Sequence, residues 1–87
     1  MVRNDVFKLI DGEREYQDSV WGNSNKRERT PTEWFVYIED YINEGKHILS
    51  REPDAIANDK AMEILRKVAA MAVCAMEETE TKPRIVK

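Results

Sequence analysis

The sequence has very few residues of the types that most often build compact chemical sites: one cysteine, one histidine and three glycines. Cys74 alone cannot form an internal disulfide, which fits a reducing compartment. Cys74 and His47 are also too few to supply a zinc site or a nucleophilic triad by themselves. No glycine-rich phosphate-binding loop is present. The candidate chemistry therefore rests on charged and aromatic side chains.

Long apolar runs, a signal-like start and an excess of basic charge are missing as well. No apolar run approaches the roughly 20 residues that span a bilayer, and residues 1–5 lack the apolar core of a signal peptide. The net charge of -3 gives no electrostatic reason to expect duplex nucleic acid as a partner. With 87 residues, 41% hydrophobic and 36% charged, the chain is predicted to be one small cytoplasmic domain over residues 1–87, without a membrane partner.

The spacing of apolar residues predicts an all-α fold of three helices, with no strand pattern and no internal repeat. The first helix is expected from Asn4 or Asp5 to Val20. The second begins at a strong start signal, with Thr30 as N-cap, Pro31 in the first turn and Glu33 closing a capping box. The third is expected from Pro53 or Asn58 to Glu78, and the tail from about residue 79 is predicted to be irregular.

Each predicted helix has an apolar face that is expected to be buried. The first helix presents Val6, Leu9, Ile10, Tyr16 and Val20, and the second and third helices are predicted to share a core of Trp34, Ile38, Tyr41, Ile48, Ile64, Val68 and Ala72. Leu65 and Met76 are placed on the same buried face of the third helix, and Ile42 and Leu49 on that of the second. Gly45 lies on the buried face of the second helix and has no side chain, so it predicts that another helix crosses close to it. A short chain with an alanine-rich helix face is expected to complete its burial by forming a homo-oligomer.

Glu13 is misplaced within the apolar face of the first helix, between Ile10 and Tyr16. An ionised carboxylate removed from water costs several kcal/mol unless a cation, a metal or several donors meet it. Two interpretations follow and stay open on the sequence alone. Glu13 forms a salt bridge with Arg66 or Lys67 of a neighbouring helix, or it belongs to a metal or nucleotide site.

Further acidic residues lie beside the apolar faces of the second and third helices. Asp40 and Glu44 are one turn apart and can share a hard divalent cation through their oxygens, although a solvated acidic edge is the commoner explanation. Glu39 lies on the opposite edge. Glu63 can pair with Lys67 on its own helix or face Asp40 across an antiparallel contact, and Lys67 is then a phosphate ligand or a counter-ion.

The end of the first helix contains Tyr16, Gln17 and Trp21. Aromatic planes and an amide suit a nucleobase pocket, because they offer stacking and hydrogen bonds to a base edge. The same residue types also close the end of an ordinary small core, which is the favoured interpretation for Trp21.

Three segments together resemble one family. Residues 13–22, with the sequence EREYQDSVWG, resemble the E-R-x-Y-Q-x-x-x-W-G opening of short, often phage-encoded MazG-like proteins. Glu33-Trp34 with residues 37–41, and residues 66–73 with Met76-Glu77, resemble the same group. The resemblance extends from about Asp5 to Arg84. No single segment is very specific, but the three segments in this order are.

The resemblance implies a three-helix, MazG-like nucleotide pyrophosphohydrolase fold that uses Mg²⁺ to cleave a nucleoside triphosphate to the monophosphate and pyrophosphate. Transferred to this chain, it implies catalytic roles for Glu13 and Glu63 and metal ligands at Glu39, Asp40, Glu44 and Glu63. It implies nucleotide contacts from Tyr16, Gln17, Trp21, Arg66, Lys67 and Arg84.

The sequence departs from the family pattern at the metal-binding positions. Asn43 and Glu44 follow Glu39 and Asp40, so the first acidic pair is not cleanly spaced, and Arg66 stands where the second pair requires an acid. A guanidinium cannot ligate Mg²⁺, whereas Arg66 or Lys67 can replace the charge of the metal. The alternative function is therefore a non-catalytic phage protein in the host cytoplasm that sequesters a nucleotide or a nucleotide-derived immune signal. A pure interaction module is a third option.

Overall fold

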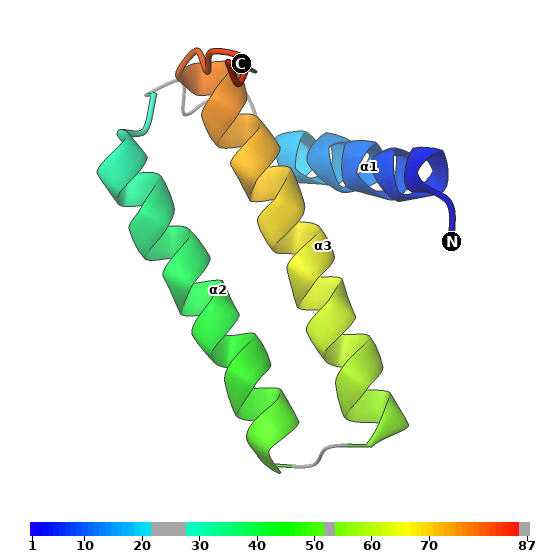
Figure 1. Cartoon of the computed structure of the whole chain (residues 1–87). Helices are drawn as coiled ribbons and strands as arrows, with labels where there is room; N and C mark the ends of the chain where they lie inside the picture. The colour runs from blue at the N-terminus through cyan, green and yellow to red at the C-terminus, as the bar shows by residue number, and fades with distance from the viewer. Residues whose placement is uncertain (22–27, 52–53, 86–87) are drawn as a thin grey trace.

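The computed structural model describes residues 1–21, 28–51 and 54–85 (Figure 1). Over these residues it contains three helices and no strand: α1 (Arg3–Trp21), α2 (Pro31–Arg51) and α3 (Ala55–Glu78). The prediction of an all-α fold with three helices is confirmed, and residues 79–85 are not helical, as expected. The alternative start of the third helix at Pro53 lies outside the described residues. None of the described helices is both long and apolar enough to span a membrane.

Local side-chain hydrogen bonds fix where α2 and α3 begin. The backbone N–H of Glu33 donates to Thr30 Oγ1 at 3.2 Å, and the backbone N–H of Thr30 donates to Glu33 Oε1 at 3.1 Å. This is the predicted capping box, which satisfies two donors that the first turn leaves without intrahelical partners. At α3, Asp54 is the N-cap and its Oδ1 accepts the N–H of Ala57 at 2.8 Å.

The helices form an antiparallel hairpin with one helix laid across it (Figure 1). α2 and α3 run side by side, and α1 packs on α3 and extends to one side of the hairpin. The radius of gyration is 14.7 Å, compared with about 12 Å for a compact domain of this length. The single chain is therefore an open arrangement rather than a closed bundle.

The core lies near the end of the hairpin where α1 ends, α2 begins and α3 finishes. Trp34, Met71 and Cys74 are buried, with Trp21, Ile38, Tyr41 and Ala75 packed against them. The indole rings of Trp21 and Trp34 are 6.4 Å apart between centroids. Of the predicted core, Trp34 is buried, and the other members are half-buried: Ile38, Tyr41, Ile48, Ile64, Val68 and Ala72.

The buried face of α1 differs from the predicted one. Four of the residues expected to be buried are exposed: Val6, Leu9, Tyr16 and Val20. The side that meets α3 instead includes Glu13, Arg14 and Gln17. Polar contacts hold this side, since Arg14 donates to Glu77 and Gln17 donates to the carbonyl of Lys67. The apolar periodicity therefore predicted the helix correctly and its buried side wrongly.

Part of the apolar surface of the hairpin is also exposed where burial was predicted. The residues concerned are Ile42 and Leu49 on α2, and Leu65 and Met76 on α3. The apolar sides of α2 and α3 are wider than their neighbouring helices cover. A Cβ on Gly45 would meet Ile64 at 3.7 Å, an ordinary van der Waals distance. The crossing of α2 and α3 is therefore not close enough to require a glycine.

Candidate functional site

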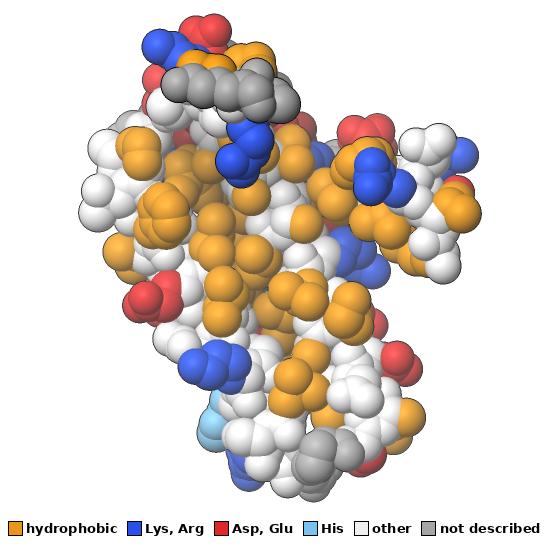
Figure 2. Space-filling view, in the orientation of Figure 1, with side chains coloured by type: hydrophobic (Ala, Val, Ile, Leu, Met, Phe, Trp, Pro, Cys, Tyr) orange, Lys and Arg blue, Asp and Glu red, His pale blue; other side chains and the backbone are white. Residues whose placement is uncertain are grey.

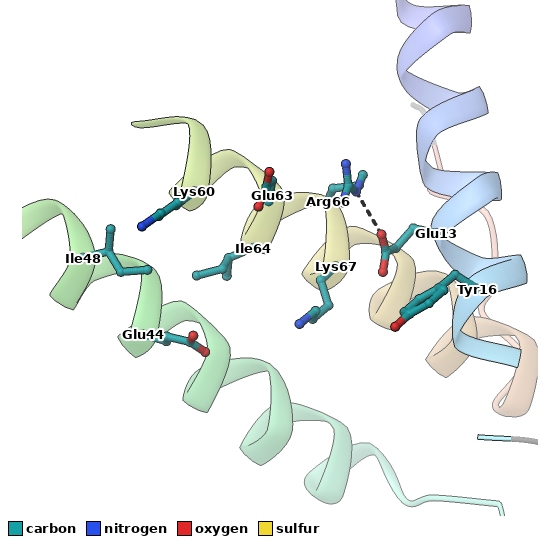
Figure 3. A pocket seen from close by; sticks show the side chains of 9 residues that line it. All are labelled: Glu13, Tyr16, Glu44, Ile48, Lys60, Glu63, Ile64, Arg66 and Lys67. Carbon is teal, nitrogen blue, oxygen red and sulfur yellow. Dashed lines mark hydrogen bonds and ion pairs between the residues drawn. The ribbon is translucent and has the colours of Figure 1, made fainter. Parts of the chain in front are cut away.

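A pocket of about 540 Å³ lies between the three helices (Figure 3). Its volume is within the range of small-molecule sites. α1 contributes Glu13 and Tyr16, α2 contributes Glu44 and Ile48, and α3 contributes Lys60, Glu63, Ile64, Arg66 and Lys67. The three helices therefore bring six predicted site residues to one pocket: Glu13, Tyr16, Glu44, Glu63, Arg66 and Lys67.

Glu13 and Arg66 form an ion pair on the wall of this pocket. Arg66 Nε donates to Glu13 Oε1 at 2.9 Å (Figure 3), and the Glu13 side chain is only 9% exposed. The salt-bridge interpretation of Glu13 is therefore confirmed, with Arg66 as the partner. Arg66 thus compensates the charge of Glu13.

Lys67 is held at the centre of the pocket wall by contacts with both neighbouring helices. Its carbonyl oxygen accepts a hydrogen bond from Gln17 Nε2 at 3.2 Å. Its Nζ lies 4.8 Å from the centroid of the Tyr41 ring, a cation–π distance. Figure 3 shows the Lys67 side chain pointing from α3 into the space between α2 and α1. The ammonium group is therefore positioned rather than free in solvent.

Lys60 lines the same pocket and was not predicted. It precedes Glu63 by three residues and Lys67 by seven, so the three side chains lie along one side of α3. That spacing is visible in the sequence, but it does not indicate a binding site by itself, because α1 and α2 form the other walls of the pocket. Lys60, Glu63 and Lys67 give the α3 side of the pocket an alternating sign of charge.

Other predicted site residues lie away from the pocket. Glu39 and Asp40 are exposed on α2 and do not line it. Trp21 packs on Trp34, as the core interpretation expected, and Arg84 is exposed beyond the end of α3. Gln17 is buried between α1 and α3 and acts on the pocket through Lys67.

The acidic residues of the pocket do not match a magnesium site within this chain. Mg²⁺ requires oxygen ligands at about 2.0–2.1 Å in octahedral geometry. Among residues 1–21, 28–51 and 54–85, no group of three or more potential ligands is close enough to hold one metal ion. Glu13 is also paired with the guanidinium of Arg66. The side chains, as they are placed, therefore do not fit the metal that the resemblance implies.

Glu78, which was not among the predicted site residues, organises a second polar cluster. Its Oε1 accepts Trp34 Nε1–H at 3.1 Å and the backbone N–H of Arg29 at 2.9 Å, and its Oε2 accepts Arg29 Nη1 at 3.1 Å. The Arg29 guanidinium lies 5.1 Å from the ring centroid of Trp21 and 4.9 Å from that of Trp34. This cluster closes the apolar core, so its role is structural.

The buried side chains around the α1–α3 contact have perturbed pKa values. The hydrogen bond from Arg14 to Glu77, at 2.8 Å, raises the pKa of that guanidinium, which is charged at any physiological pH. Burial raises the pKa of the Cys74 thiol, and the nearby Glu78 carboxylate acts in the same direction. Since the thiolate is the reactive form, Cys74 is a buried core residue without nucleophilic character at neutral pH.

A comparison of the chain with protein-family models, with curated proteins and with solved structures gave no match.

Proposed function

We propose that this protein binds a nucleotide, or a nucleotide-derived small molecule, in the pocket between its three helices. The observation that carries the proposal is the mixed lining of that pocket, where Lys60, Lys67 and Arg66 lie beside Tyr16, Glu44 and Glu63. A nucleotide needs both cationic donors and anionic acceptors, because its phosphates accept hydrogen bonds while its ribose hydroxyls and base amino groups donate them.

Each class of side chain has a proposed role. Lys60 and Lys67 bind phosphate oxygens as point charges. Glu44 and Glu63 accept hydrogen bonds from sugar hydroxyls or base N–H groups, and the exposed ring of Tyr16 offers a stacking plane. Arg66 is a positioning residue, because its ion pair with Glu13 joins α1 to α3 at the pocket wall.

The resemblance to MazG-like proteins supports a nucleotide as the ligand class, and the departure at Arg66 supports binding without turnover. The favoured function is therefore a non-catalytic protein that sequesters its ligand in the cytoplasm, that of the host cell if the protein is phage-encoded. Hydrolysis remains the second candidate, since Glu13, Glu44 and Glu63 from three helices line the same pocket. No magnesium-dependent step is assigned, because these acids do not gather around one point.

The proposal is tested by equilibrium dialysis of the protein against a panel of nucleoside mono-, di- and triphosphates, with and without Mg²⁺, measuring both retained ligand and released pyrophosphate. The expected result is retention in the absence of Mg²⁺ and no pyrophosphate. Lys60→Ala and Lys67→Ala should each weaken retention by about tenfold, the loss of one charge-assisted contact. Lys8→Ala, at an exposed lysine of α1, is the matched control and should bind as the wild type does.

Two results would contradict this account. Magnesium-dependent pyrophosphate release that Glu63→Gln abolishes would establish the hydrolase instead. Retention of no nucleotide under any condition would remove the proposed function altogether.

A further inference from the structure

The pocket between the three helices continues past Lys60 into a second hollow, near the end of the α2–α3 hairpin where α2 ends and α3 begins. This hollow has a volume of about 340 Å³ and shares two lining residues with the pocket, Ile48 and Lys60. Its lining also includes Arg51, the last residue of α2, and Asp54, the N-cap of α3. The pocket and this hollow adjoin at Lys60 and form one groove, here called the hairpin groove. Figure 2 shows the apolar surface of the same hairpin as a band of hydrophobic side chains.

Two cationic positions lie far apart along the hairpin groove. Lys67 Nζ is 4.8 Å from the centroid of the Tyr41 ring, whereas Lys60 lines the groove together with Ile48. Lys60 and Lys67 are seven residues apart on α3. Tyr41 and Ile48 are also seven residues apart on α2, which runs antiparallel to α3. At a rise of 1.5 Å per residue, the two cationic positions are therefore about 10 Å apart along the helices.

Acidic side chains occupy the stretch between these two positions. Glu44 comes from α2 and Glu63 from α3, and both line the groove (Figure 3). The third acid of the pocket, Glu13, is paired with Arg66. The sign of charge along the groove is therefore positive at Lys60, negative in the middle and positive at Lys67. A phosphate in the middle would face two carboxylates, and such contacts between like charges are unfavourable. A sugar there would instead donate hydrogen bonds from its hydroxyl groups.

We propose that the hairpin groove binds a nucleoside that carries a phosphate group on each side of its ribose, as nucleoside 3′,5′-bisphosphates do. This inference rests on the proposed function and specifies its ligand class. One phosphate binds Lys67, and the other binds Lys60 and Arg51 at the far end of the groove. The ribose between them donates to Glu44 and Glu63. The 5′-phosphorylated end of an oligonucleotide has the same chemistry, because its first ribose is also flanked by two phosphates.

Nucleoside di- and triphosphates match this groove less well. Their phosphorus atoms are joined through single bridging oxygens, so all of the phosphate charge lies at one end of the nucleoside. Such a ligand reaches one cationic position at a time, and a chain of phosphates extending along the groove meets Glu44 and Glu63. These nucleotides are therefore expected to bind, but more weakly than a ligand whose phosphates are separated.

The test compares two constitutional isomers, adenosine 3′,5′-bisphosphate and ADP, which contain the same atoms and differ in whether the ribose separates the phosphates. Dissociation constants are measured by isothermal titration calorimetry in EDTA, and the same pair is measured for guanosine, cytidine and uridine. For at least one base, the bisphosphate should bind at least tenfold more tightly than the diphosphate. A 5′-phosphorylated dinucleotide of that base then distinguishes the two sources. Binding as tight as that of the bisphosphate indicates an oligonucleotide end, and weaker binding indicates the free bisphosphate.

A variant in the acidic stretch tests the reason for the preference. Glu44→Gln removes the negative charge and keeps an amide oxygen as acceptor, so the preference for the bisphosphate should fall by about tenfold as the diphosphate binds more tightly. Glu39→Gln is the matched control, because Glu39 is an exposed acid of α2 that lines neither hollow, and its preference should equal that of the wild type. Arg51→Ala should weaken the bisphosphate by about tenfold, through the loss of one charge-assisted contact. Circular dichroism checks that each variant retains its helices.

The possible failures of the two proposals are distinguishable. Diphosphates that bind as tightly as the bisphosphates for every base would overturn this inference and leave nucleotide binding in place. A preference that Glu44→Gln leaves unchanged would also overturn it, because the acidic stretch would then not select the ligand. Binding of neither isomer with any base would remove the proposed function, and this inference with it.

Discussion

At the scale of single residues, the ion pair between Glu13 and Arg66 joins α1 to α3 at the wall of the pocket, with 2.9 Å between Arg66 Nε and Glu13 Oε1. Glu13 stands out in the sequence because a carboxylate interrupts an apolar series, and its side chain is 9% exposed in the structure. The partner could be predicted because an almost buried carboxylate must meet a cation, and Arg66 was one of two basic residues considered. Arg66 itself is 44% exposed, which limits the energy of the pair.

The Glu13–Arg66 pair gives a prediction for stability. In a double-mutant cycle of Glu13→Ala and Arg66→Ala, followed by urea unfolding, the coupling free energy should be about 1 kcal/mol, near the upper end for a partly exposed pair. Glu15→Ala and Arg66→Ala are the control cycle, because Glu15 is exposed on α1 and should couple by less than about 0.3 kcal/mol. Additive effects of Glu13→Ala and Arg66→Ala would show that the pair contributes nothing.

Other residues of the site were predictable only in part. Tyr16 and Lys67 were assigned to the pocket from their residue types and from the resemblance, and both line it. Lys60 was missed because its spacing from Lys67 looks like an ordinary solvated helix surface until two other helices enclose it. Asp40 was expected to converge with Glu44 and Glu63, but it does not line the pocket, although Glu44 one turn later on the same helix does. Spacing by one helical turn shows that two residues share a helix face, but it does not show whether both side chains reach a pocket.

At the scale of helices, the start of α2 could be predicted because its cause is local, whereas α3 begins at Ala55, three residues before the expected start at Asn58. The capping box joins Thr30 to Glu33, three residues away. The docking side of α1 could not be predicted, because its contacts cross 63 residues from Arg14 to Glu77 and 50 residues from Gln17 to Lys67. Such polar contacts leave no periodic signal in the sequence. Apolar periodicity consequently predicted a face that shares Ile10 and Glu13 with the docking side but omits Arg14 and Gln17.

The same polar contacts predict how α1 detaches. Arg14→Ala removes both hydrogen bonds to Glu77, which join α1 to α3, so α1 should lose about 2 kcal/mol of docking free energy. Since α1 packs on α3 and leaves the α2–α3 hairpin intact, its opening is expected to be local. Hydrogen exchange followed by mass spectrometry should show faster exchange in residues 3–21 and unchanged protection in α2. Equal acceleration in all three helices would show that α1 is an inseparable part of the fold.

At the scale of the whole molecule, the fold class followed from periodicity alone, whereas the arrangement of the helices did not. A heptad stripe indicates that a helix packs against a partner, but it does not identify the partner. The burial predicted at Ile42 and Leu65 assumed that their side of each helix faced the interior of the chain, and both residues are exposed.

The most direct test of the central claim is residue-level mapping of ligand binding by nuclear magnetic resonance. The isotope-labelled protein is titrated with an equimolar mixture of ribo- and deoxyribonucleoside triphosphates in the presence of EDTA, and the amide shifts are followed. The account predicts saturable shifts centred on Tyr16, Lys60, Glu63 and Lys67, which Lys60→Ala reduces and Lys8→Ala does not. Shifts confined to residues 79–85, or no shift at all, would contradict nucleotide binding in the pocket between the three helices.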